Sequence, residues 1–76
     1  MDIYAEILAQ AKEGITKTRI MYQANLSFLQ LKKCLNELTS FGLIEVKNLL
    51  YKTTVRGVRF LDLYEEVQSL VGKRNS

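Results

Sequence analysis

Side chains that can bind phosphate or the edges of nucleotide bases lie in three stretches in the middle of this sequence. The cations and hydroxyls of the first stretch can hold phosphates, and in the second a glutamine, a lysine and a leucine suit adenine, guanine and a thymine methyl. The cations and amide of the third stretch can follow a neighbouring backbone or minor groove. The pattern predicts contact with double-stranded DNA through Lys17, Thr18, Arg19 and Tyr22; Ser27, Leu29, Gln30, Lys33 and Asn36; and Lys47, Asn48 and Lys52.

The first two stretches also have an interpretation that involves no DNA. Tyr22 could pack in the core while Lys17 and Arg19 act only as solubilising charges, and the second stretch could be a solvated helix face. Arg56 and Arg59, farther along the chain, either continue the basic surface or pair with acids on their own helix. The sequence leaves these alternatives undecided.

The charge of the chain is concentrated in its middle. Residues 14–59 contain eight lysines and arginines but only two acids, whereas residues 1–13 and 60–76 each carry a small negative charge. A basic middle between acidic ends is typical of a protein that faces a polyanion on one side and protein on the other.

The sequence contains no recognisable set of side chains for catalysis or for metal binding. Cys34 is the only cysteine and histidine is absent, so neither an activated thiol nor a Cys/His zinc site is expected. Asp62, Glu65 and Glu66 accompany no metal or phosphate motif. We therefore expect no enzyme activity, no metal and no cofactor.

The composition favours one small globular domain over residues 1–76. Apolar residues make up 47% of the chain and charged residues 25%, and no apolar run approaches the roughly 20 residues that span a bilayer. The acidic N-terminus does not resemble a signal peptide. We expect no membrane association and a cytoplasmic, nucleoid-associated location, in a host cell if the chain is encoded by a virus or plasmid.

Apolar residues recur at helical spacing in three segments, which predicts helices over Asp2–Lys12, Lys17–Ala24 and Ser27–Ser40. Gly14 can follow the first helix, and Ser27 and Gln30 form a capping box at the start of the third. Asn25 and Leu26 leave only a tight turn before that helix. The residues expected to be buried in the second and third helices are Ile20, Met21, Phe28, Leu31, Leu35 and Leu38.

The remaining segments predict a hairpin and a last helix. Leu43–Lys47 and Leu49–Thr53 have strand composition and are separated by Asn48, and Ile15–Thr16 reads as a brief extended link. Thr54 can cap a helix to about Gly72, within which Gly57 can mark a close approach to another backbone, and Lys73–Ser76 is expected to fray. The order predicts a mainly α fold with a small β-hairpin: a winged helix-turn-helix with an additional C-terminal helix, in which helix 27–40 enters the major groove.

The residues also resemble a known family over nearly the whole chain. The resemblance rests on Lys12–Tyr22, Asn25–Ser27, Gly42–Ile44, Tyr51–Thr54 and Gly57, which look like those of archaeal winged-helix transcriptional regulators. That family includes small dimeric chromatin-associated proteins whose C-terminal helices pair as an antiparallel coiled coil. The resemblance implies DNA binding and dimerisation.

The last helix has two apolar faces in the sequence. Val55, Val58 and Leu61 form one arc, which we expect to dock on the core. A second chain would then cover the other face, which has the spacing of a coiled-coil seam; alternatively, the first helix folds back over it. The residues of this expected dimer face are Phe60, Leu63, Tyr64, Val67, Leu70 and Val71.

The function predicted from these patterns is transcriptional regulation by a DNA-binding homodimer. Two alternatives remain: an architectural chromatin protein, and a winged-helix module that binds another protein. A continuous basic surface would favour DNA, whereas cations scattered around an apolar patch would favour protein.

Overall fold

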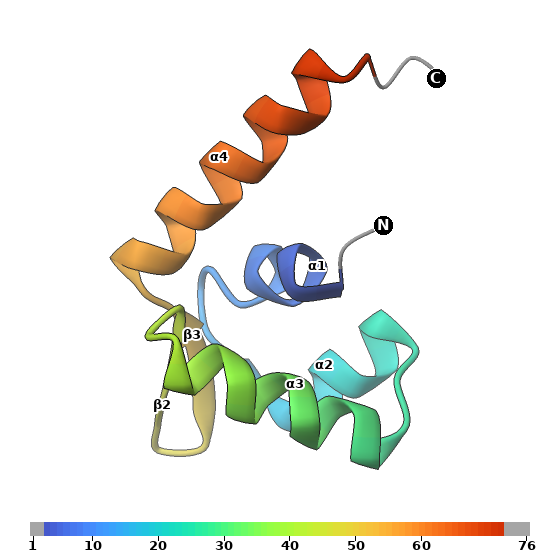
Figure 1. Cartoon of the computed structure of the whole chain (residues 1–76). Helices are drawn as coiled ribbons and strands as arrows, with labels where there is room; N and C mark the ends of the chain where they lie inside the picture. Colours follow the sequence, from blue (N-terminus) through green and yellow to red (C-terminus); the bar gives the residue numbers. More distant parts are fainter. Residues whose placement is uncertain (1–2, 73–76) are drawn as a thin grey trace.

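Four helices and a small three-stranded sheet make up the computed structural model, which describes residues 3–72, and the β2–β3 hairpin lies at one edge of the molecule (Figure 1). In chain order the elements are α1 (Ile3–Gln10), β1 (Ile15–Thr16), α2 (Lys17–Ala24), α3 (Phe28–Ser40), β2 (Ile44–Lys47), β3 (Leu50–Thr53) and α4 (Val55–Leu70). This confirms the predicted fold class. The expected helix start at Asp2 and the expected frayed tail Lys73–Ser76 lie outside the described residues.

Hydroxyl side chains define where three of the helices begin. The Oγ atoms of Thr16, Ser27 and Thr54 each accept a hydrogen bond from the backbone N–H three residues later. Each bond satisfies one of the N–H groups that the first turn of a helix leaves without a partner. These local signals explain why the helix starts follow so directly from the sequence.

The sheet has the order β1-β3-β2, with both pairs antiparallel. The segment expected to be only a link, Ile15–Thr16, pairs with Tyr51 and Leu50 and so forms the third strand. We call the hairpin of residues 44–53 the wing. Its turn consists of Asn48 and Leu49, both with positive φ, so the prediction that Leu49 begins the second strand is wrong. Lys47 pairs with Leu50, and positive φ at both residues of the two-residue loop between them is typical of a type I′ turn.

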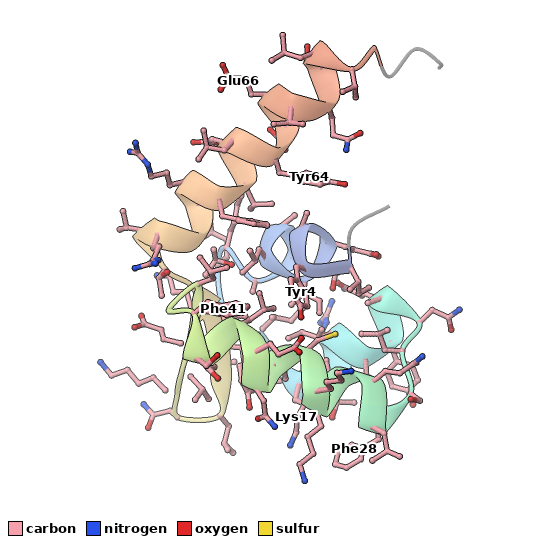
Figure 2. All side chains as sticks on the ribbon, viewed as in Figure 1. Tyr4, Lys17, Phe28, Phe41, Tyr64 and Glu66 are labelled. Carbon is pink, nitrogen blue, oxygen red and sulfur yellow. The ribbon has the colours of Figure 1, made fainter. Side chains whose placement is uncertain are left out.

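The core lies where α1, α2, α3 and the base of the wing meet. Its fully buried large side chains are Ile7, Leu8, Ile20, Leu31, Leu38 and Ile44. The prediction that Phe28 joins this core is wrong, because its side chain is 54% exposed. Phe28 is the first residue of α3, and its ring lies 5.6 Å from the Lys17 ammonium, on the side of the molecule opposite α4 (Figure 2).

The start of α4 is fixed to the end of α3 by the residues around Thr54. Its hydroxyl donates to the Gly42 carbonyl at 2.7 Å, and its N–H donates to the Leu43 carbonyl. A Cβ on Gly57 would collide with that same carbonyl oxygen and would lie 2.6 Å from Thr53 Cγ2. The close backbone approach expected at Gly57 is therefore present.

This contact sets the rotation of α4 about its axis and changes which side chains are buried. Gly57 and Leu61 are buried, whereas Val58 is exposed and Val55 is 89% exposed, so the prediction that both valines dock on the core is wrong. Helix α4 crosses α1, and its C-terminal half extends beyond the rest of the domain (Figure 1).

Candidate nucleic-acid interface

Helices α2 and α3 form a helix-turn-helix with a short, well-fixed turn. Asn25 adopts the left-handed conformation with φ 57°, and the N–H of Leu26 donates to the Met21 carbonyl at 3.0 Å. Leu26 is packed against the core. The turn therefore holds the start of α3 in a defined direction relative to α2.

The exposed face of α3 carries three of the predicted base-contacting residues. Leu29, Lys33 and Asn36 follow one another at spacings of four and three, and all are exposed. This places them on one stripe, opposite the buried stripe of the helix. The Leu29 side chain is 75% exposed, so it is free to contact a partner.

Lys32 is a residue of this face that the sequence reasoning missed. It is exposed, and helical geometry places it beside Asn36, on the side of α3 that also carries Phe28. The helical projection could have found it. The sequence pattern predicts that Phe28 is buried, and Lys32 lies on the side of the helix that this prediction assigns to the core.

Gln30 and Ser27 have a structural role at the start of α3. The Ser27 N–H donates to Gln30 Oε1 at 2.9 Å, and the Gln30 N–H donates to Ser27 Oγ at 3.2 Å. This is the predicted capping box. The Gln30 amide oxygen is therefore already engaged, whereas a bidentate contact with adenine needs both ends of that amide.

The four predicted phosphate-binding residues of α2 do not form a single cluster. Tyr22 is 77% exposed, which excludes the alternative that it packs in the core. Lys17 lies over the Phe28 ring beside α3, and Thr18 is exposed at the start of α2. Arg19 instead lines a hollow with Leu50 and other residues around β1.

The wing presents two faces of different character. The side chains of Val46 and Tyr51 share a hollow of about 250 Å³ with Lys17 and Thr18 at the start of α2, and Leu49 at the wing tip also lines it. Lys47, Asn48 and Lys52 line a hollow on another side, where Glu13 and Glu45 are present. Lys52 pairs with Glu45 across the strands, so opposite charges face each other there. The structure thus separates the wing lysines from Lys17.

The only cysteine lies in a groove between α1 and α3. Cys34 is half-buried there beside Lys33, Tyr4 and Glu37. Burial raises the pKa of the Cys34 thiol, and the positive charge of Lys33 lowers it by less. Within residues 3–72, no group of three or more acidic, cysteine or histidine side chains is arranged to hold a metal ion.

The expected dimer face is covered only in part. Phe60 and Tyr64 pack against the core with their rings stacked 6.4 Å apart, and Figure 2 shows Tyr64 on the α1 side of α4. Helix α1 therefore covers this part of the stripe, as the alternative interpretation proposed. The other members of the stripe remain exposed: Leu63, Val67, Leu70 and Val71.

Comparison with known proteins gives one match that covers almost the whole chain. The family described as winged helix-turn-helix matches residues 1–72. No curated protein matches the sequence closely enough to count as a relative. Within the described residues, no helix is long and apolar enough to cross a membrane.

Proposed function

Because the chain belongs to the winged helix-turn-helix family, we propose that it binds double-stranded DNA and acts as a transcriptional regulator, with α3 in the major groove. The observation that carries the proposal is the exposed face shared by α2 and α3. Leu29, Lys33 and Asn36 project from one stripe of α3, and Lys17 lies beside the start of that helix. The N-terminal half of α3 is the part that enters the groove in this architecture.

The residues of this face have distinct roles in the proposal. Lys33 contacts guanine or phosphate, Asn36 suits adenine, and Leu29 suits a thymine methyl. Lys17 and Thr18 hold phosphates and fix the position of α3 along the duplex. Lys32 adds a cation on the side of α3 that also carries Phe28.

The remaining predicted contacts have supporting roles. Ser27 and Gln30 hold the start of α3, and Tyr22 reaches a phosphate with its exposed hydroxyl. Arg19 contacts the DNA backbone that flanks this face. The wing residues with the same role are Lys47, Asn48 and Lys52.

We further propose that two copies pair through α4. Leu63, Val67, Leu70 and Val71 form a stripe that stays exposed within residues 3–72, along the half of α4 that extends beyond the rest of the domain (Figure 1). Burying such a stripe removes an aggregation hazard. A two-fold pair would present two α3 helices to half-sites roughly 34–36 Å apart on the duplex.

The sequence resemblance supports the proposal that the protein is an archaeal regulator, encoded by a cell, virus or plasmid. The composition and the residue types support the proposals that it works in the cytoplasm at the nucleoid and that it has no enzyme activity. An architectural chromatin role uses the same face with less base preference.

A second candidate function, binding of another protein, is favoured by one observation. Tyr22, Phe28 and Leu29 are all more than half exposed on α2 and the start of α3, and exposed apolar side chains can dock a protein. The separation of Arg19 and the wing lysines from Lys17 also favours this second function, because the cations do not form one continuous surface. The cations Lys17, Lys32 and Lys33, which lie among the exposed apolar residues, favour DNA, because a protein-binding surface gains little from uncompensated positive charge.

The experiment that tests DNA binding is a titration of a fluorescent mixed-sequence duplex at several salt concentrations. Affinity should fall steeply as salt rises, because each neutralised phosphate releases condensed counterions. Lys17→Ala should weaken binding to all sequences alike, and Arg59→Ala, which removes the same charge from an exposed position on α4, serves as the matched control and should weaken binding less. No binding at low salt, or an affinity that does not depend on salt, would exclude this function.

A further inference from the structure

Leu49 at the wing tip has a strained backbone conformation and an exposed apolar side chain, and neither stabilises the fold. Leu49 has φ 67°, and its side chain is 83% exposed, so it contributes little to the core. Of the three residues other than glycine with positive φ in the described part of the chain, the other two are asparagines, Asn25 and Asn48. Asparagine and glycine adopt this conformation readily, whereas a leucine there is strained.

The position of Leu49 connects this strained residue with the proposed interface. It lines the hollow between the wing and the start of α2, together with Lys17 and Thr18. Lys47 and Asn48 precede it, and both are exposed. An apolar side chain therefore stands at the tip of the hairpin, with phosphate-binding groups on either side.

The geometry of the DNA duplex indicates which groove the wing tip contacts. When α3 occupies the major groove, the hollow between α2 and the wing can receive the adjacent phosphate strand. The groove on the other side of that strand is the minor groove, and we expect the wing tip to enter it. Apolar side chains in the minor groove can wedge between base pairs and partly unstack them, which kinks the duplex.

We propose that Leu49 is a minor-groove wedge that distorts DNA where the wing contacts it. This inference rests on the proposed DNA binding and adds deformation of the duplex to it. Steps that unstack readily, above all TA, are the preferred sites, so the wing selects sequence through the cost of deformation. In this inference the strained backbone at Leu49 serves to hold an apolar side chain at the tip, and such strain is common at functional sites.

The test uses a duplex with several TA steps in which each adenine is replaced by 2-aminopurine, whose fluorescence rises when it unstacks. Anisotropy of a terminal dye reports binding in the same titration. Wild-type protein and Leu49→Met should bind and raise the fluorescence. Leu49→Gly should keep its affinity within about tenfold but lose the rise, because the wedge is absent while the phosphate contacts remain.

Two controls separate the wedge from effects on folding. Leu49→Gly creates an Asn-Gly turn, so its urea midpoint should be no lower than that of the wild type. Val55→Ser removes an equally exposed apolar side chain from α4 and should leave the fluorescence rise unchanged.

The outcomes distinguish this inference from the proposed function. Binding by the wild type without a fluorescence rise, or an equal rise with Leu49→Gly, would overturn the wedge and leave DNA binding intact. Absence of any anisotropy change with the wild type would overturn DNA binding, and the wedge with it.

Discussion

Side chains at the start of α3 divide into those that hold the helix and those that face outward. Gln30 and Ser27 bind each other's backbone, whereas Leu29 and Lys33 have no such partner and remain exposed. The sequence placed all four in the interface, because spacing alone does not show which way a side chain is used. The sequence also predicted the capping box of Ser27 and Gln30, and the structure confirms it, so the capping role of Gln30 can be measured separately from DNA binding.

Gln30→Ala should lower the free energy of unfolding by about 0.5–1 kcal/mol, because it removes half of the capping box. Lys33→Ala should leave stability nearly unchanged and reduce DNA affinity and base preference. Urea denaturation and a DNA titration of both variants give the comparison. A Gln30→Ala protein of unchanged stability that loses base preference would assign Gln30 to base contact instead.

The Cys34 thiol should react slowly with iodoacetamide at neutral pH. Its pKa is raised by burial, so less of the reactive thiolate is present than in an exposed cysteine, and the rate should rise only at higher pH. The control is the same reaction in urea, where the pKa returns to its ordinary value. Equal rates in the folded and unfolded protein would contradict the burial of Cys34.

At the scale of elements, the sequence predicted what local signals determine. Helix starts depend on hydroxyl caps and turns on residues such as Asn25, and both act within a few residues. The rotation of α4 depends instead on Gly57 meeting the Leu43 carbonyl, a contact between distant segments. For the same reason, spacing predicted that Val55 and Phe28 are buried, although no neighbouring element covers them.

Gly57→Ala should destabilise the protein by about 1–3 kcal/mol, even though alanine favours helix more than glycine does. The added Cβ would collide with the Leu43 carbonyl oxygen, which already accepts the Thr54 N–H at 3.0 Å. Val55→Ala, at an exposed site of the same helix, should change stability by less than about 0.5 kcal/mol. Urea denaturation of both variants tests this, and equal stabilities would show that the contact does not fix α4.

At the scale of the whole molecule, we propose that its two ends have different functions. The α2 and α3 face with the wing tip lies at one end, and the uncovered stripe of α4 extends from the other (Figure 1). The sequence predicted this separation from its charge distribution. It did not predict how far α1 covers the stripe, because that depends on how α4 crosses α1.

The wild type should sediment as a dimer, at twice the 8.8 kDa of one chain. Replacing Leu63 and Val67 together by glutamate should give a folded monomer with much weaker DNA binding, because charges cannot be buried in the seam. Val55→Glu, on another side of α4, should remain dimeric. A wild-type monomer at high micromolar concentration would contradict pairing through α4.

The central claim is that the face formed by α2, α3 and the wing tip binds DNA. The most direct measurement is a series of ¹H–¹⁵N NMR spectra of the full chain during titration with a short duplex. We expect amide signals to shift for residues 16–19, 27–36 and 46–50, whereas those of residues 63–70 should shift little. Shifts concentrated in α4, or no shifts at low salt, would contradict it.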